Sequence, residues 1–120
     1  MPGGDVDPDR LPPLFCLRYL AKGWSVEDCT PEEKAALADT LYQLSRRTWL
    51  ELKLAPRHGS GCEKIPRSRV RTGVPHHITE DVQDFLAFRF CGKAPLVGYR
   101  DGRVLHIVWL DRQFKLYDHG

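Results

Sequence analysis

The chain has 120 residues, of which 42% are hydrophobic and 28% charged, and its formal net charge at pH 7 is +2. This composition predicts one globular domain with its own hydrophobic core, and it excludes a chain that is disordered throughout. The four cysteines are too few for a disulfide scaffold. No apolar run approaches the roughly 18–20 residues that span a bilayer, and the N-terminus lacks the pattern of a signal peptide. We therefore expect a cytoplasmic protein with reduced thiols and no membrane contact.

The small net charge conceals an uneven distribution along the sequence. Residues 1–45 hold four basic and eight acidic side chains, whereas residues 46–120 hold fourteen basic and eight acidic ones. The densest positive stretch is residues 57–71, in which Glu63 is the one acidic residue. Clustered Arg and Lys side chains can bind a polyphosphate such as RNA, or they can form a solvated surface loop. Charge alone leaves both interpretations open.

The first elements in chain order are a leader and a strand. Residues 1–13 are rich in Pro, Gly and Asp and predict a flexible leader ahead of a single domain over residues 14–120. Apolar and polar side chains alternate over residues 14–20, which predicts a strand.

A helical region follows. Thr30 and Glu33 have the spacing of a capping box, with Pro31 at the first helical position. One helical face is then largely apolar, because side chains recur on it at steps of three or four: Leu37, Leu41, Leu44, Thr48 and Leu52. Pro56 ends the pattern. One long helix and two shorter helices both fit, and the alternation over residues 50–54 also allows a strand there.

The second half of the chain combines a long loop with several strands. Residues 57–80 show no sustained period, and a loop of this length is usually functional or mobile. Asp101-Gly102 is a strong hairpin signal. We predict strands over residues 85–90, 96–100, 104–110 and 114–117. The fold class is therefore α+β, with an N-terminal strand and a helical layer packed on a C-terminal antiparallel β-meander.

Three groups of residues have chemistry suited to a functional site. Tyr117 and His119 are two residues apart, so in an extended chain they lie on one side, and imidazole suits proton transfer at neutral pH; a frayed terminus is the alternative. Arg89 lies inside the most apolar strand and needs a phosphate ligand or a structural acidic partner. Glu63 could act as a base, orient an arginine or form an incidental surface ion pair.

The cysteines and histidines do not have the spacing of metal ligands. There is no Cys-x-x-Cys motif, and His76 and His77 are adjacent rather than one helical turn apart. We therefore expect no metal site and no cofactor, and we expect the thiols to be buried.

Four segments of the chain resemble the RelE-like toxin superfamily, which includes the RelE, YoeB and HigB types. They are FLAFRF (85–90), LVGYRDGRVLHIVW (96–109), LYDH (116–119) and the polar segment GCEKI (61–65). The order of strand, helix and meander is similar as well. The resemblance implies a ribosome-dependent mRNA endoribonuclease that needs no metal and is held in check by a cognate antitoxin.

The resemblance also implies roles for individual residues. Arg89 would hold the scissile phosphate, and His119 would be the general acid. Tyr117 would be its neighbour, although Asp118 separates the two here, whereas the YoeB type has them adjacent. Glu63 would be the general base. Lys64 would contact a phosphate, and Arg100 and Arg103 beside the hairpin could add positive charge. With Arg67, Arg69 and Arg71 of the basic stretch, they are the expected RNA contacts.

Two other functions fit the same sequence. The first is a non-catalytic module of this fold that binds RNA or a protein through the basic loop. The second is a phage or mobile-element protein with a toxin-like fold and a target other than the ribosome. Convergence of Arg89, His119 and Tyr117 on one open pocket with basic residues around it would favour catalysis. Arg89 capped by an acid in the core would favour the binding module.

Overall fold

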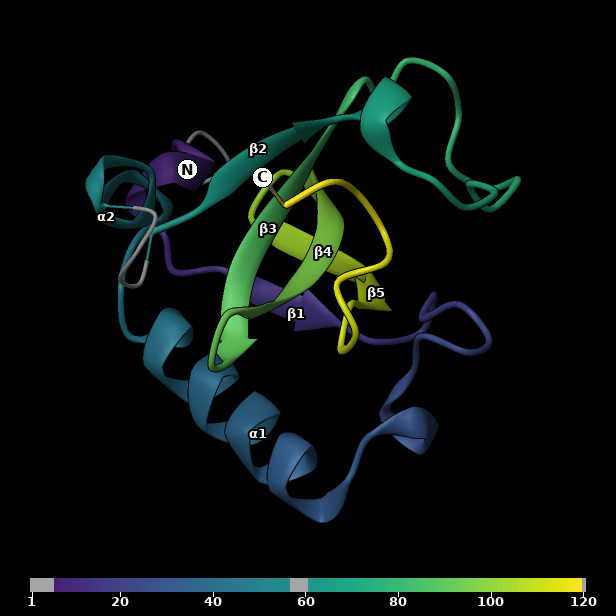
Figure 1. The fold of residues 1–120 in the computed structure, drawn as a ribbon. Helices are drawn as coiled ribbons and strands as arrows, with labels where there is room; N and C mark the ends of the chain where they lie inside the picture. Colours follow the sequence, from purple (N-terminus) through teal and green to yellow (C-terminus); the bar gives the residue numbers. More distant parts are fainter. Residues whose placement is uncertain (1–5, 57–60, 120) are drawn as a thin grey trace.

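The computed structural model describes residues 6–56 and 61–119. These residues form an α+β fold with a five-stranded mixed sheet in the order β1-β5-β4-β3-β2 (Figure 1). The strands are β1 (Leu14–Cys16), β2 (Glu63–Pro66), β3 (Asp84–Cys91), β4 (Ala94–Asp101) and β5 (Val104–Leu110). The helices are α1 (Pro31–Ser45) and α2 (Trp49–Leu54), with short 3-10 turns at Pro8–Arg10, Val26–Asp28 and Arg67–Arg69. No helix in the described part of the chain is long and apolar enough to cross a membrane.

The C-terminal meander is confirmed. β3, β4 and β5 pair in antiparallel fashion, and β1 joins β5 in parallel. The Asp101-Gly102 turn connects β4 to β5, with Gly102 at φ 60°, the left-handed conformation that this type of turn requires. A second tight turn with Gly92 at φ 58° connects β3 to β4.

The helical region consists of two helices, because it contains two capping boxes. Thr30 and Glu33 cap α1 as predicted: the Thr30 hydroxyl accepts from Glu33 N at 3.2 Å, and the Glu33 carboxylate accepts from Thr30 N at 2.7 Å. Thr48 and Glu51 repeat this arrangement at the start of α2. The second box breaks the helical region after Ser45 and makes residues 50–54 helical, so the alternative of a strand there is wrong.

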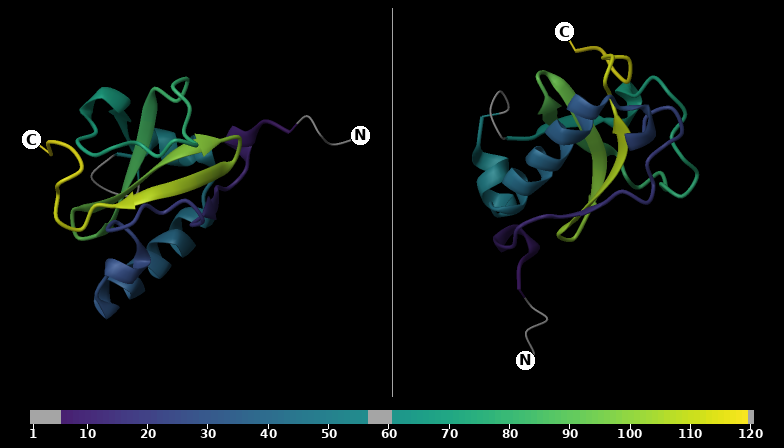
Figure 2. Two further views of the ribbon diagram at one scale, coloured as in Figure 1. Left: turned by 90° about the vertical axis from the view of Figure 1, so that its right-hand side faces the viewer. Right: turned by 90° about the horizontal axis from the view of Figure 1, so that it is seen from below.

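Both faces of the sheet are covered by apolar side chains. Neighbouring residues of a strand point to opposite sides, and β3 is apolar at most successive positions. Phe88 and Phe90 pack toward α1 and α2, whereas Phe85 and Ala87 pack toward residues 67–82 and the C-terminal tail, residues 111–119. Figure 2 shows the helices on one side of the sheet and these two segments on the other. Arg89 follows the alternation of Phe85 and Ala87 onto the face opposite the helices, and it also borders a depression beside α1 that Asp39, Thr40, Gln43 and Leu44 line.

Three sequence predictions need correction. Residues 114–117 form turns rather than a strand, because the tail folds back around the buried Asp111, which accepts from two of its amides. The strand predicted over residues 14–20 ends at Cys16, where a turn closed by Leu20 N and Leu17 O follows. The predicted long loop contains β2, which pairs with β3 from Glu63 to Pro66.

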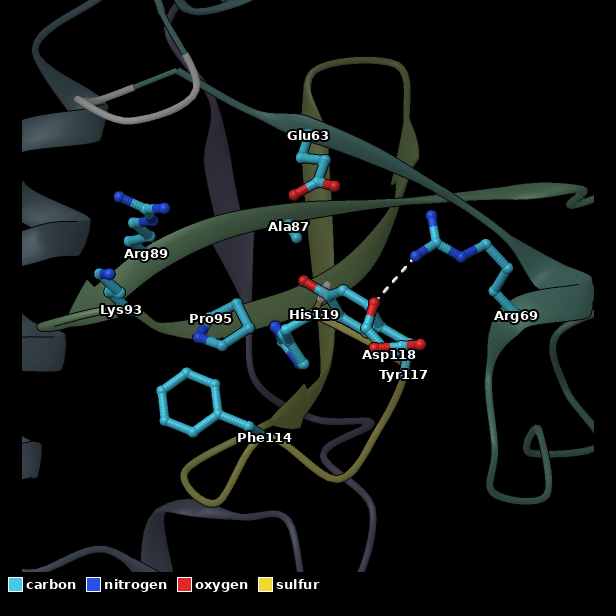
Figure 3. Close-up of a pocket in the computed structure, with 10 residues that line it drawn as sticks. All are labelled: Glu63, Arg69, Ala87, Arg89, Lys93, Pro95, Phe114, Tyr117, Asp118 and His119. Carbon is cyan, nitrogen blue, oxygen red and sulfur yellow. Dashed lines mark hydrogen bonds between the residues drawn. The ribbon is translucent and has the colours of Figure 1, made fainter.

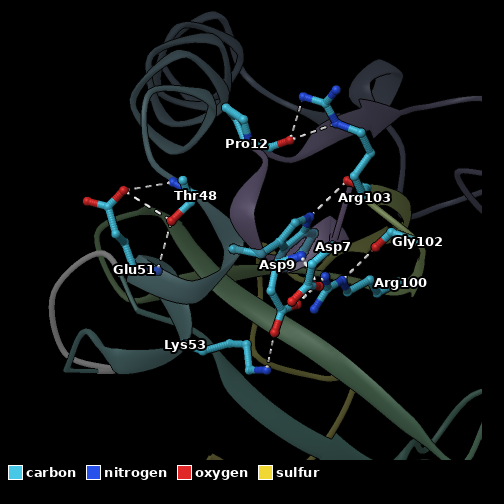
Figure 4. A network of polar contacts seen from close by, with 10 residues as sticks. Asp7, Asp9, Pro12, Thr48, Glu51, Lys53, Arg100, Gly102 and Arg103 are labelled. Carbon is cyan, nitrogen blue, oxygen red and sulfur yellow. Dashed lines mark hydrogen bonds and ion pairs between the residues drawn. The ribbon is translucent and has the colours of Figure 1, made fainter. Parts of the chain in front are cut away.

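Residues 6–13 of the predicted leader make contacts with the rest of the domain, while residues 1–5 lie outside the described residues. Asp9 binds Lys53 Nζ at 2.9 Å and Arg100 Nη2 at 2.5 Å (Figure 4). The Arg100 guanidinium lies 4.3 Å from the centroid of the Trp49 ring. Arg103 donates two hydrogen bonds to the Pro12 carbonyl. These contacts hold the segment against α2 and the β4–β5 hairpin.

The Asp9 ion pairs should make stability depend on pH in the acid range. Hydrogen bonds from Lys53 and then Arg100 hold the Asp9 pKa below its usual value of 3.8. A lowered carboxyl pKa stabilises the fold above pH 3.8, and the stabilisation disappears as the pH falls through the lower folded-state value. We expect Asp9→Asn to lower the free energy of unfolding at neutral pH by up to about 1 kcal/mol, because the pair is partly exposed.

Urea unfolding of both proteins over the acid range measures this effect. The two free energies should converge as the pH falls below 3.8. If the difference in free energy of unfolding between the wild type and Asp9→Asn stayed constant down to the lowest pH, the charge of the Asp9 carboxylate would not contribute to stability.

Candidate functional site

A pocket of about 370 Å³ opens on the face of the sheet opposite the helices. Its walls come from β2, β3, the β3–β4 turn, the start of β4, the Arg67–Arg69 turn and the C-terminal tail (Figure 3). The ten lining residues are Glu63, Arg69, Ala87, Arg89, Lys93, Pro95, Phe114, Tyr117, Asp118 and His119. The volume lies within the usual range of small-ligand sites.

Strand pairing places Glu63 and Arg89 in this pocket. Glu63 pairs with Ala87 across the β2–β3 ladder, so the two side chains share a face. Arg89 is two residues further along β3 on the same face, opposite Pro95 of β4. The irregular pairing between Arg89 and Cys91 lies beside the pocket, where bulges often re-aim a side chain. In Figure 3 the Glu63 carboxylate points toward the space above His119.

His119 is held in position by the carboxylate of Asp111, a residue that the sequence analysis did not identify. Asp111 is fully buried, and its carboxylate accepts from Lys115 N at 2.8 Å and from Leu116 N at 3.1 Å. The same carboxylate lies 2.9 Å from His119 Nε2. A buried carboxylate bound to one ring nitrogen fixes the tautomer and the orientation of the ring. The other nitrogen, Nδ1, is then the one available to transfer a proton.

Tyr117 supports His119 from the side. The two rings stack with centroids 4.0 Å apart, and Phe114 packs against His119 edge to face at 5.2 Å. Only 3% of Tyr117 is exposed, so its ring is part of the core beneath the pocket. Sequence analysis expected the two side chains on one side of an extended strand; a turn around Asp111 brings them together instead.

The pocket carries more positive than negative side chains. Arg69, Arg89 and Lys93 line it, against Glu63 and Asp118. Arg69 is held in place, because its Nη2 donates to the Asp118 carbonyl at 2.9 Å and its guanidinium lies 5.9 Å from the Tyr117 ring centroid. This fixed positive charge suits an anionic group such as a phosphate.

The structure separates the other predicted RNA contacts from this pocket. Lys64 and Arg100 line a different depression beside α2, and Arg100 is paired with Asp9. Arg103 is bound to Pro12. The Arg67 guanidinium donates to the carbonyls of Ile78, Thr79 and Val82, and thus closes the segment over residues 67–82. Arg71 is exposed and does not line the pocket.

Sequence reasoning missed Lys93, Phe114 and Asp111. Lys93 follows Gly92 between two apolar runs, so a hairpin prediction there could have placed it at the end of β3. Phe114 lies in the segment 114–117 that was predicted as a strand, and Asp111 lies just before it. Nothing in the local pattern indicated that the Asp111 carboxylate is buried.

The thiols and possible metal ligands form no site of their own. All four cysteines are free thiols. Within residues 6–56 and 61–119, no group of three or more His, Cys, Asp or Glu side chains could hold a metal ion. Burial raises the pKa of the Cys29 and Cys62 thiols, which makes them less reactive.

The Asp111 carboxylate is expected to be important for stability. Asp111→Asn keeps the shape of the side chain but replaces one carboxylate oxygen, an acceptor, with an amide NH2 group, a donor. That donor would face a backbone N–H group, which also donates. We expect a loss of about 1–3 kcal/mol in the free energy of unfolding, the usual cost of an unsatisfied buried polar group. Urea unfolding measures it, with Asp118→Asn, which is exposed, as the matched control. Equal midpoints for the two variants would contradict the assigned network.

Comparisons of this chain with protein-family models, with curated proteins and with solved structures give no significant match.

Proposed function

We propose that this protein is a RelE-like, metal-independent endoribonuclease that cleaves mRNA. One observation carries the proposal: Glu63, Arg89 and His119 come from three separate segments and line one open, positively charged pocket. Base, phosphate ligand and acid are the three groups that cleavage beside a ribose 2′-OH requires. The resemblance of the meander and the tail to RelE-like toxins supports the same function.

In the proposed reaction the Glu63 carboxylate takes the proton of the ribose 2′-OH. The 2′-oxygen then attacks the phosphorus, and the bond to the 5′-oxygen of the next nucleotide breaks. Arg89 neutralises the charge that develops on the phosphate oxygens, with Lys93 and Arg69 nearby. His119 gives a proton to the leaving 5′-oxygen. The products are a 2′,3′-cyclic phosphate and a 5′-hydroxyl.

Asp111 and Tyr117 position His119 in this scheme. The Asp111 carboxylate holds Nε2, and the stacked Tyr117 ring fixes the plane of the imidazole. Nδ1 is therefore the nitrogen that carries the proton to the leaving group. Tyr117 acts through His119, because almost none of its surface is open to the pocket.

The wider biological setting is also part of the proposal. Following the resemblance, we propose that the protein acts in the cytoplasm, cleaves mRNA on the ribosome and belongs to a toxin–antitoxin pair. The alternative, a non-catalytic module that binds RNA or protein through the basic loop, has less support, since Arg67 is used inside its own segment and Arg69 lines the pocket. Arg57 and His58 of that loop lie outside the described residues.

Expression of the protein alone in a bacterial host tests the proposal. Wild-type protein should arrest growth, and Arg89→Ala and His119→Ala should relieve the arrest at equal protein level. Lys34→Ala, on the exposed side of α1, is the matched control and should arrest growth like the wild type. Harmless expression of the wild type would count against a toxin. Salt-dependent RNA binding without cleavage would favour the binding module.

A further inference from the structure

An exposed aromatic side chain stands at the edge of the pocket. Phe114 is 44% exposed and lines the pocket together with Lys93, Pro95 and His119. Figure 3 shows its ring below Pro95 and on the side of the pocket away from Arg69. Most of the other large aromatic side chains of the tail and sheet, such as Tyr117 and Trp109, are buried. The ring therefore offers an apolar surface beside the positively charged side chains.

The backbone of Phe114 is strained. Its φ is 58°, and it is the one residue other than glycine with a positive φ in the described part of the chain. This left-handed conformation is unfavourable for a residue with a Cβ, and a bulky aromatic is a poor choice for it, whereas Gly or Asn adopts it readily. The chain is tied to Asp111 on both sides of this conformation: Phe114 N donates to the Asp111 carbonyl at 3.4 Å, and Lys115 N donates to the Asp111 carboxylate at 2.8 Å.

Two unfavourable features thus coincide in one residue: a strained backbone and a half-exposed apolar ring. Strained residues of this kind cluster at functional sites. Aromatic rings in such positions bind unstacked nucleobases, because every base has a face that stacks. The cations of Arg89 and Lys93 line the same pocket and suit the phosphate of the same nucleotide.

We propose that Phe114 is a nucleobase-stacking platform, so that the pocket takes a single-stranded segment of RNA with one base against the ring. This inference rests on the proposed function and adds the subsite that holds a base beside the scissile phosphate. Stacking accepts all four bases, so the subsite favours single-stranded over paired RNA more than one base over another.

Phe114→Gly tests the inference without relying on a variant that fails to fold. Glycine relieves the left-handed strain, which offsets the loss of the ring contact with His119, and we expect a melting temperature close to that of the wild type. Phe114→Trp keeps a stacking surface. Tyr42→Ala is the matched control, because Tyr42 is 59% exposed on α1, on the other side of the sheet.

The measurement is the fluorescence anisotropy of a short labelled single-stranded RNA made uncleavable by 2′-deoxy substitution. We expect Phe114→Gly to bind it roughly 5- to 150-fold more weakly, the range that loss of one stacked base predicts. Phe114→Trp and Tyr42→Ala should bind like the wild type. Removal of one base from the oligonucleotide, which leaves an abasic position, should weaken its binding to the wild type. The same change should weaken binding to Phe114→Gly much less, because that variant has no ring on which the base could stack.

Two results would overturn the inference alone: equal affinity of the wild type and Phe114→Gly, or an abasic penalty that is the same in both. In either case cleavage of normal RNA by the wild type would leave the proposed function intact. If the wild type neither binds nor cleaves RNA, the proposed function fails, and this inference fails with it.

Discussion

Replacement of His119 by alanine should lower the rate of RNA cleavage by roughly 100- to 10,000-fold, the range that a general acid contributes. The 5′-oxygen is a poor leaving group without a proton, and His119 is the imidazole in the pocket, held by Asp111 at 2.9 Å. Arg89→Ala should lower the rate by roughly 100- to 1,000-fold, as expected for one preorganised charged contact to the transition state.

Single-turnover cleavage of a labelled RNA by purified protein measures both effects. His119→Gln is a useful second variant, because its amide can still donate to Asp111 and keep the tail folded. It should be nearly as inactive as His119→Ala. Lys34→Ala should cleave at the wild-type rate. Cleavage by His119→Gln at the wild-type rate would exclude His119 as the acid.

The largest stability effect is expected at Gly98, in the middle of β4. A Cβ built on this residue would lie 2.1 Å from the His106 carbonyl oxygen and 2.9 Å from Ile107 Cα. These are backbone atoms of β5 at the point where the β4–β5 register shifts, so they cannot move aside as a flexible side chain could. We expect Gly98→Ala to lower the free energy of unfolding by about 3 kcal/mol or more, at the upper end of overpacking effects.

Gly73→Ala is the matched control for this substitution. No atom lies within 4 Å of a Cβ built there, so its effect should be within about 0.5 kcal/mol. Urea unfolding of both variants tests the comparison. A Gly98→Ala midpoint equal to that of Gly73→Ala would mean that β4 and β5 do not approach each other as closely as the structure has them.

The sequence predicted the regular parts of the fold well, because their signals are local. Alternation and the Asp101-Gly102 turn indicated β4 and β5, and the Thr30–Glu33 capping box indicated the start of α1. β2 was missed because it has only four residues, one of them Pro66, and lies in a charged segment without a period. Its pairing depends on the edge of β3, which a local pattern cannot reveal.

The candidate site was predicted only in part, because it too depends on contacts between segments that are distant in the sequence. Glu63, Arg89, Tyr117 and His119 were chosen by residue type and by the resemblance, and they line one pocket. Phe114 and Asp111 were missed because their places depend on how the tail folds back. Of the six basic residues predicted as RNA contacts, only Arg69 lines the pocket. Charge density along the sequence does not indicate which guanidinium groups bind backbone carbonyls, as those of Arg67 and Arg103 do.

Identification of the RNA ends most directly tests the claim that this pocket promotes attack by a ribose 2′-OH. Purified protein would be incubated with translating ribosomes and a labelled mRNA, and the termini of the fragments would be mapped chemically. The proposal predicts a 2′,3′-cyclic phosphate or its 3′-phosphate on one fragment, a 5′-hydroxyl on the other, and no cleavage at a 2′-deoxy position. Cleavage at a 2′-deoxy position, or mRNA that stays intact beside active ribosomes, would contradict it.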